Sequence, residues 1–301
     1  MHDVRRAAVR SIPVVVCSLA AVALVGCLPA GNTGTEGLKV LSAETFLADI
    51  AQNIAGDRVI VESLLSPGID PHEFQATPQD AIKIARAQVL IVNGLGYEAW
   101  LEKSLDASAG ERLVVEASAG VVPGSEGDPH LWMNPRHVVR YAENIRDGLS
   151  EADPNGRSVY AANADVYIAQ LLDLDEWIKA EVAQVPSKKR VLITNHDALE
   201  SFAAAYGFEI AGVVIPSYTS GAAPSAQQMA ELIRTIKSLE APAIFLDVSE
   251  NQDLARQIAS ESGAQVITGL YVETLSGPGG PAATYIEMLK HDVGLIVEAL
   301  R

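Results

Sequence analysis

Cysteine is nearly absent from this chain of 301 residues, which contains only Cys17 and Cys27. Cys17 lies inside an apolar run near the N-terminus, and Cys27 follows that run closely. If the chain is cut before Cys27 and that thiol carries a lipid, no free cysteine remains for a disulfide or for thiolate ligation of a metal ion. Any metal site in the globular part must therefore use His, Asp and Glu.

Basic residues are also scarce, with 22 Lys and Arg against 38 Asp and Glu and a formal net charge of −16. Arg5, Arg6 and Arg10 lie close to the N-terminus, so the remainder is still more acidic. This balance argues against nucleic acid and anionic lipid as binding partners, and it mildly favours cations. Screening over about 8 Å at physiological salt means that the charge balance identifies no particular site.

The N-terminal segment combines a basic start with an apolar run over residues 11–25. That run is too short for a comfortable membrane span, and the pattern is typical of a secretory signal peptide over residues 1–26. Residues 24–27 resemble a bacterial lipobox, in which cleavage before Cys27 leaves its thiol to carry a lipid. The alternative is an ordinary signal peptide with a chance cysteine. We expect residues 27–37 to be the lipidated residue and a flexible tether rich in Gly and Thr.

Strands and helices alternate over residues 38–155, which predicts a first α/β lobe with a mainly parallel sheet. The run from Val89 to Val92 is continuously apolar, as in a buried parallel strand. Thr77 and Pro78 suit the N-cap and the first position of a helix. In lobes of this kind, ligands bind at the carboxyl ends of the strands.

A helical spacing of apolar residues continues over residues 156–185, and about 30 residues at 1.5 Å each give about 45 Å. We expect this helix to join two lobes; the alternative is an ordinary surface helix of a single domain. The alternation of strands and helices resumes over residues 186–301 and predicts a second lobe. The predicted fold class is therefore α/β, with two lobes of mainly parallel sheet joined by a long helix.

Three histidines are candidates for chemistry. The tripeptide Asp-Pro-His occurs twice, ending at His72 and at His130, and each proline stiffens the backbone before the imidazole. His196 follows the apolar run 191–193, where a strand would end, and Glu273 lies in a loop near the C-terminus. Our interpretation is that these four side chains converge on one transition-metal ion. Spacing alone also allows an alternative without a metal site, since a single loop histidine is more often a surface or hydrogen-bonded residue.

Three aspartates are candidates for a supporting role. Asp70 and Asp128 would either orient the adjacent imidazoles as hydrogen-bond acceptors or simply form Asx-turns. Asp247 follows an apolar strand and is a reserve carboxylate at the sheet edge. His137 and His291 lie on expected helices and are interpreted as surface residues.

Several motifs together resemble one protein family, the zinc/manganese solute-binding lipoproteins of ABC metal importers (cluster A-I, metal-binding family 9). The resemblance covers essentially all of the chain after the signal segment, and its motifs occur in the order typical of the family. The motifs are the sequence Asp-Pro-His-Glu-Phe-Gln-Ala-Thr-Pro-Gln-Asp at 70–80, Asn-Gly-Leu-Gly-Tyr-Glu-Ala-Trp-Leu at 93–101, Asp-Pro-His-Leu-Trp-Met-Asn-Pro at 128–135, Asn-His-Asp-Ala at 195–198, Gly-Gly-Pro at 279–281 and Thr-Tyr-Ile at 284–286.

The resemblance implies a metal in the cleft between the lobes, bound by His72 and His130 from the first lobe and by His196 and Glu273 from the second. It implies a receptor and not an enzyme: a monomer outside the cell, anchored to the cell membrane by lipid at Cys27. The implied partners are an ABC permease and its cytoplasmic ATPase. No nucleic acid is expected to bind.

This sequence departs from the family pattern in two places. The last ligand is usually Asp, and Glu273 adds one methylene, which changes the reach of the carboxylate. Many zinc-binding members carry a His-rich acidic loop before the second Asp-Pro-His, whereas residues 121–127 contain no histidine.

Three imidazoles and one carboxylate suit tetrahedral Zn²⁺, which we take as the leading cargo. Mn²⁺, the alternative, prefers more oxygen ligands, which a bidentate Glu273 would partly supply. The manganese members of the family often have Glu in place of the third histidine, so His196 favours zinc. Less favoured functions are a secreted zinc hydrolase, a surface adhesin and a receptor for a metal chelate. A hydrolase needs an open coordination position and a general base, and the sequence contains no His-Glu-x-x-His.

Overall fold

The computed structural model describes residues 37–301, apart from 102–104, 106–110, 124–126, 216–223 and 250–251. The expected signal peptide, Cys27 and nearly all of the expected tether lie outside the described residues. Within the described part, no helix is both long enough and apolar enough to cross a membrane.

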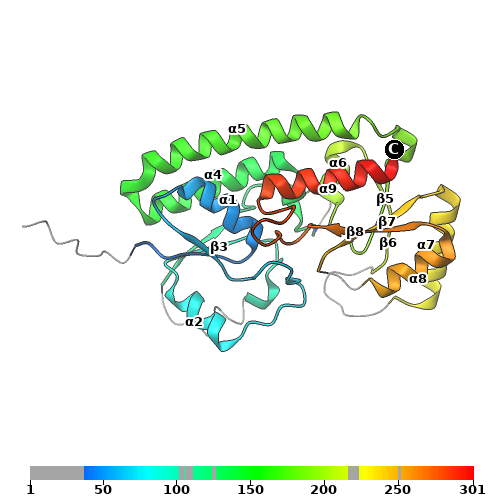
Figure 1. Ribbon diagram of the computed structural model, residues 1–301. Helices are drawn as coiled ribbons and strands as arrows, with labels where there is room; N and C mark the ends of the chain where they lie inside the picture. The colour runs from blue at the N-terminus through cyan, green and yellow to red at the C-terminus, as the bar shows by residue number, and fades with distance from the viewer. Residues whose placement is uncertain (1–36, 102–104, 106–110, 124–126, 216–223, 250–251) are drawn as a thin grey trace, which may run out of the picture. The chain divides into compact units, whose positions relative to one another are not determined.

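Two parallel four-stranded sheets form the centres of two lobes, which confirms the predicted fold class (Figure 1). In the first lobe the strand order is β2-β1-β3-β4, and in the second it is β6-β5-β7-β8. The strands are β1 (Val40–Ser42), β2 (Val61–Ser63), β3 (Val89–Val92), β4 (Leu113–Glu116), β5 (Val191–Thr194), β6 (Glu209–Val213), β7 (Ala243–Asp247) and β8 (Gln265–Leu270).

Helices pack around both sheets, and their capping residues follow the sequence signals. The Thr77 side chain accepts a hydrogen bond from the backbone N–H of Asp80, and Ser225 does the same for Gln228. The described helices of the two lobes are α1 (Thr45–Ala55), α2 (Pro78–Arg86), α4 (Pro135–Ala152), α6 (Glu200–Tyr206), α7 (Ala226–Leu239), α8 (Asp253–Ser262) and α9 (Tyr285–Leu300). Single 3₁₀ turns lie at Leu131–Met133, Pro154–Gly156 and Ser187–Lys189.

Helix α5 (Arg157–Val182) is the long helix that the apolar spacing predicts. It runs beside α1 and α4 of the first lobe and beside α6 and α9 of the second (Figure 1). Its buried side chains recur every three or four residues, so one stripe faces the protein along the whole helix. These side chains are Tyr160, Ala164, Tyr167, Leu171, Leu174, Asp175, Ile178 and Val182.

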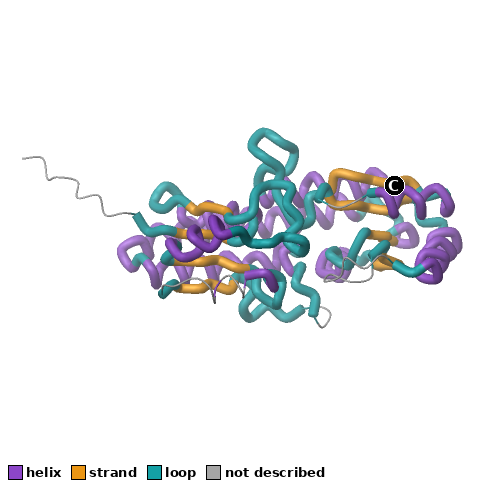
Figure 2. The backbone as a smooth tube through the Cα atoms, turned by 90° about the horizontal axis from the view of Figure 1, so that it is seen from below, coloured by secondary structure: helices purple, strands orange, loops and turns teal. Residues whose placement is uncertain are grey.

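The largest cluster of buried apolar side chains is continuous through both lobes. It joins Ile91 in the first sheet, Leu192 and Phe245 in the second sheet, and the buried stripe of α5. Near its centre, the Trp132 ring stacks on the Phe46 ring at a centroid distance of 4.4 Å. Between the two sheets lie mainly loops, which follow the strands and carry the polar residues of the site (Figure 2).

Candidate metal centre

The four side chains predicted to bind a metal come together at the carboxyl ends of both sheets. His72 lies in the loop after β2, His130 after β4, His196 after β5 and Glu273 after β8. Parallel strands end at the same edge of a sheet, so these loops meet in the space between the lobes. One potential ligand atom from each residue lies within 4.8 Å of the other three.

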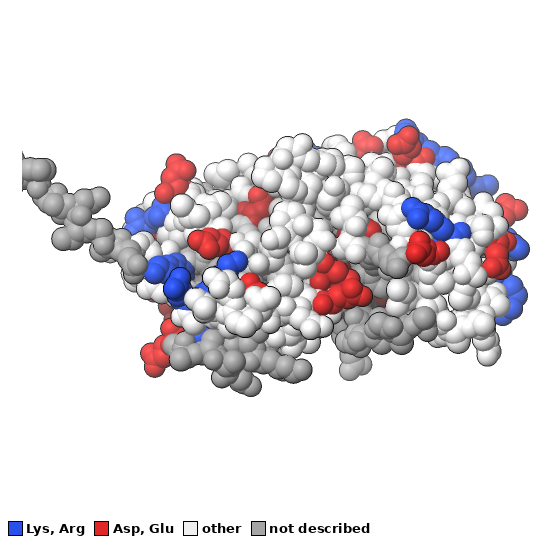
Figure 3. Space-filling model, turned by 60° about the horizontal axis from the view of Figure 1, so that its bottom comes forward, with Lys and Arg blue, Asp and Glu red and all other residues white. Residues whose placement is uncertain are grey.

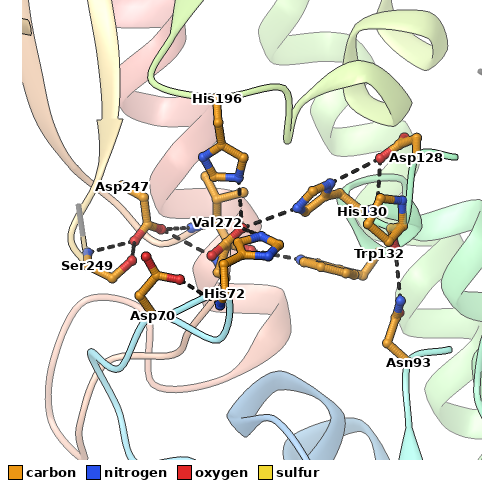
Figure 4. A network of polar contacts seen from close by, with 12 residues as sticks. Asp70, His72, Asn93, Asp128, His130, Trp132, His196, Asp247, Ser249 and Val272 are labelled. Carbon is orange, nitrogen blue, oxygen red and sulfur yellow. Dashed lines mark hydrogen bonds and ion pairs between the residues drawn. The ribbon is translucent and has the colours of Figure 1, made fainter. Parts of the chain in front are cut away.

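The three imidazoles surround a single carboxylate oxygen (Figure 4). Oε1 of Glu273 lies 2.9 Å from Nε2 of His72, 3.2 Å from Nε2 of His130 and 2.8 Å from Nε2 of His196. The side chains of His130 and Glu273 are 0% and 1% exposed, against 10% for His196 and 15% for His72. Solvent therefore reaches the cluster mainly past His72 and His196.

The histidines keep Glu273 ionised in spite of its burial. Burial alone would raise the pKa of Glu273, but the charge of His196 and hydrogen bonds from the three imidazoles hold it well below its usual range. Burial would conversely lower the pKa of His72, yet the hydrogen bond and the charge of Glu273 leave it raised. The cluster thus combines an ionised oxygen donor with imidazoles that must lose their protons to bind a metal ion.

Asp128 holds the imidazole of His130 as well as its backbone. Its Oδ1 accepts the backbone N–H of His130 at 2.8 Å and lies 3.1 Å from Nδ1 of the ring. Because Nδ1 faces the carboxylate, Nε2 points at the centre of the cluster. The other oxygen, Oδ2, accepts a hydrogen bond of 3.0 Å from Ser201 on α6, so Asp128 also links the two lobes.

Asp70 and Asp247 act on backbone groups. Asp70 Oδ1 accepts the backbone N–H of His72 at 2.8 Å, which is the Asx-turn geometry. Asp247 Oδ2 accepts the backbone N–H groups of Val272 and Glu273, the latter at 3.3 Å, while Oδ1 accepts two hydrogen bonds from Ser249. Asp247 therefore supports the segment that carries Glu273.

Sequence reasoning did not assign the roles of three residues around the cluster, which are Asn93, Tyr141 and Trp132. Asn93 Nδ2 donates to the Pro129 carbonyl at 3.0 Å, directly before His130, and its Oδ1 accepts a 2.6 Å hydrogen bond from Tyr141. Trp132 donates from Nε1 to the Val272 carbonyl at 2.8 Å, next to Glu273. The motif Asn-Gly-Leu-Gly was the available signal for Asn93, but it does not show what the amide would contact.

Tyr97 packs its ring on the edge of the cluster, with centroids 5.2 Å from His72 and 5.7 Å from His130. The turn before it is strained, because Leu95 adopts φ 56° between Gly94 and Gly96, whose φ values are also positive. This turn brings the aromatic ring against the two histidines.

Two further histidines of the described residues lie outside the cluster. His137 and His291 are half-buried, not exposed as we expected. His137 Nδ1 lies 3.2 Å from the Leu131 carbonyl, and His291 Nε2 lies 2.9 Å from the Gly269 carbonyl. The surface prediction fails for both because each imidazole meets a backbone carbonyl of a neighbouring segment.

Known proteins resemble this chain over nearly its whole folded length. The manganese-binding lipoprotein MntA of Halalkalibacterium halodurans is 34% identical over 284 residues, covering 91% of this chain and 93% of the relative. The iron-binding protein YfeA of Yersinia pestis is 34% identical over 267 residues, covering 86% and 85%. The structure of the periplasmic zinc binding protein TroA from Treponema pallidum aligns with a TM-score of 0.81 and 27% identity, covering 88% of this chain and 99% of TroA.

The family model described as zinc-uptake complex component A, periplasmic, matches residues 40–299. That range contains both lobes, α5 and the four clustered side chains. The chain therefore belongs to the family of periplasmic zinc-uptake components, the solute-binding proteins of metal ABC importers.

Proposed function

We propose that this protein captures one divalent transition-metal ion, with Zn²⁺ as the leading cargo, and delivers it to an ABC permease. His72, His130, His196 and Glu273 are the proposed ligands. The observation that carries the proposal is the convergence of three Nε2 atoms, from both lobes, on Oε1 of Glu273. None of these donors is a sulfur atom, in agreement with the sequence, in which both cysteines lie in the N-terminal 27 residues.

The spacing of the donor atoms supports a tetrahedral ion. Donors held about 2.0–2.1 Å from zinc lie about 3.4 Å from one another in a regular tetrahedron. Here the nitrogen-to-oxygen distances are 2.8–3.2 Å, and the whole set lies within 4.8 Å. Small movements of the four side chains would therefore accommodate the ion without displacing either lobe.

The four ligands would complete a tetrahedral shell, which suits binding and not catalysis. A zinc hydrolase keeps one position open for water, whereas a binding protein gains from a closed shell of protein ligands. The largest group of Asp and Glu side chains on the face shown in Figure 3 lies near its middle, while Lys and Arg, together with further Asp and Glu, lie toward both ends. Such a distribution attracts cations toward the cleft.

Manganese is the alternative cargo in the same role. The names of the relatives refer to manganese, iron and zinc, so family membership alone leaves the ion open. Glu273 favours manganese if both of its oxygens bind, because Mn²⁺ prefers more oxygen donors than Zn²⁺. His196 favours zinc, because a third imidazole completes a nitrogen-rich tetrahedral shell.

The cellular setting that we propose follows from the N-terminal segment and the relatives. The relative MntA of Halalkalibacterium halodurans is named a lipoprotein, and Cys27 is the residue that would carry the lipid. The protein would then work as a monomer outside the cell, anchored to the cell membrane, and would pass its ion to a permease driven by a cytoplasmic ATPase. Mass spectrometry of the membrane fraction tests the lipid at Cys27.

Calorimetric titration of metal-stripped residues 28–301 with Zn²⁺ and with Mn²⁺ tests the proposed function. We expect one tight equivalent of Zn²⁺ and weaker binding of Mn²⁺. The reverse order would make manganese the cargo. Absence of tight binding to correctly folded protein would remove the metal site and reopen the adhesin and chelate-receptor alternatives.

A further inference from the structure

The segment that carries Glu273 is held by two buried carboxylates. Tyr271 donates its backbone N–H to Oδ1 of Asp292 at 2.9 Å, and the next two residues donate theirs to Oδ2 of Asp247. Asp292 is 1% exposed and Asp247 is 3% exposed. Three consecutive backbone N–H groups are thus oriented by acids from two different elements, α9 and the end of β7.

Burying the carboxyl group of Asp292 at this place costs free energy. Burial raises its pKa well above the usual range, and the neighbouring charge of Asp247 acts in the same direction. Its second oxygen, Oδ2, has no hydrogen-bond partner among the described residues. One backbone hydrogen bond stabilises the fold by less than it costs to leave a buried polar atom unpaired, so stability alone does not explain this acid.

Helix α9 contacts the same segment at a second point. His291 Nε2 lies 2.9 Å from the Gly269 carbonyl, and the His291 ring meets the Tyr271 ring at a centroid distance of 5.6 Å. The start of α9 is itself bonded to the first lobe, because Tyr285 donates its backbone N–H to Asp49 and its hydroxyl to the Trp132 carbonyl. Helix α9 therefore connects the backbone before Glu273 to the lobe that provides His72 and His130.

We propose that Asp292 is a positioning residue for the metal site, acting through the N–H of Tyr271 on the backbone of Glu273. Together with Asp247 it determines how far the Glu273 side chain reaches toward the three imidazoles. A glutamate ligand needs such control more than an aspartate would, because one additional rotatable bond gives its carboxylate more positions. This proposal rests on the proposed function, since it assigns Asp292 a role in the same site.

The first test compares Asp292→Asn with Asp292→Leu, with Zn²⁺ affinity measured by competition against a chromophoric chelator. Asparagine keeps the Oδ1 acceptor and matches the neutral form that the raised pKa favours, so affinity should stay at the wild-type level. Leucine has the same branching and the same number of side-chain heavy atoms but accepts no hydrogen bond, and we expect it to weaken Zn²⁺ binding about 10–100-fold, the usual effect of losing a partner behind the ligands. Wild-type affinity in folded Asp292→Leu would overturn the proposal.

A double-mutant cycle with Glu273→Ala separates positioning from general destabilisation. If Asp292 acts through Glu273, the loss caused by Asp292→Leu should disappear once the carboxylate is gone. An equal loss in both backgrounds would mean that Asp292 acts on the fold and not on the ligand. If Asp292→Leu does not fold, Asp292→Ala enters the same cycle.

Asp175→Leu is the matched control, because Asp175 is also a carboxylate only 1% exposed, but it accepts its hydrogen bonds from Arg136, Lys179 and Tyr206, away from the metal cluster. It should lower the thermal midpoint and leave Zn²⁺ affinity unchanged. Failure of wild-type protein to bind either Zn²⁺ or Mn²⁺ would contradict the proposed function itself. Suppose that wild-type protein binds Zn²⁺ tightly, that Glu273→Ala weakens this binding, and that the effects of the two substitutions in the cycle are additive. This result would contradict only the role of Asp292.

Discussion

The two Asp-Pro-His tripeptides have the same sequence and the same local turn but different surroundings. In each, the aspartate Oδ1 accepts the backbone N–H of the histidine at 2.8 Å. In the second tripeptide, Asp128 also meets the His130 ring and Ser201 of the other lobe, and His130 is fully buried. In the first, His72 keeps 15% of its side chain exposed. Local sequence thus determines the turn, and tertiary contacts determine how firmly each imidazole is held.

The largest difference should follow from removing the buried imidazole. We expect His130→Ala to weaken Zn²⁺ binding by more than the roughly 100-fold that loss of a supporting partner causes, because a ligand is lost and Asp128 is left without its ring partner. His72→Ala should cost less, since its site is open to water that can replace the nitrogen. Calorimetry measures both, with His137→Gln as a control outside the cluster. A greater loss for His72→Ala would reverse the comparison.

Neutralising the two aspartates sharpens the same contrast. Asp128→Asn should weaken Zn²⁺ binding about 10–100-fold, because the amide no longer favours a protonated Nδ1 on His130. Asp70→Asn keeps an oxygen for the backbone N–H of His72 and should have a clearly smaller effect. Competition titrations of both variants decide the point. Equal losses of Zn²⁺ affinity in the two variants would show that the contact of Asp128 with the His130 ring does not determine the affinity.

Acidification should release the ion, and the more exposed imidazole should respond first. Metal binding requires neutral imidazoles, so affinity falls as pH drops, by up to about tenfold per pH unit for each proton that competes. The pKa of His72 is raised in the metal-free protein, because the hydrogen bond and charge of Glu273 outweigh the effect of burial, so proton competition at His72 begins above the ordinary imidazole value of 6.5. Zn²⁺ titrations between pH 5.5 and 8 measure the profile.

Replacing His72 by Gln should flatten the upper part of that profile, and an unchanged profile would assign the competing proton elsewhere.

The metal-free protein should show two opposite trends in stability. The depressed pKa of Glu273 gives stability that is present above its ordinary value of 4.5 and is lost as pH falls through the folded value. The raised pKa of His72 gives stability that is full below 6.5 and is lost as pH rises through the folded value.

The smallest effect should come from the hydrogen bond between the lobes. Ser201→Ala removes the hydroxyl that donates to Asp128 Oδ2, and we expect it to lower the free energy of unfolding by about 0.5–1.5 kcal/mol. Urea denaturation measures this difference. Ser260→Ala, which removes an exposed hydroxyl bonded to the Gln257 carbonyl, should change almost nothing. Equal changes in the two variants would mean that the contact across the lobes adds no stability.

The sequence predicts those features that depend on local pattern. Apolar runs such as Val89 to Val92 indicated parallel strands, and the position of His196 shortly after such a run indicated a side chain at the sheet edge. The caps at Thr77 and Ser225 follow from residue type and spacing alone. Because parallel strands end at one edge, local signals were enough to bring candidate residues toward the same region.

Features that depend on contacts between distant segments could not be predicted. Helix α6 begins only at Glu200, because after His196 the chain first turns back with the Ala198 N–H bonded to the His196 carbonyl. The contacts of Asp128 with Ser201 and of Tyr271 with Asp292 join residues far apart in the sequence, and no periodicity encodes them. Asp247 was placed correctly at a strand end, but its partners are backbone groups that spacing cannot reveal.

The apolar cluster that is continuous through both lobes also has a consequence for cooperativity. One face of each sheet packs into this shared cluster together with α5, while the other face of each sheet packs against a smaller apolar cluster within its own lobe. The described chain should therefore melt in one calorimetric transition, and either lobe expressed alone should expose apolar surface and aggregate. A bound ion would raise the midpoint temperature of that single transition. The reason is that a ligand that binds only the native state stabilises every part of the protein that unfolds in the same transition.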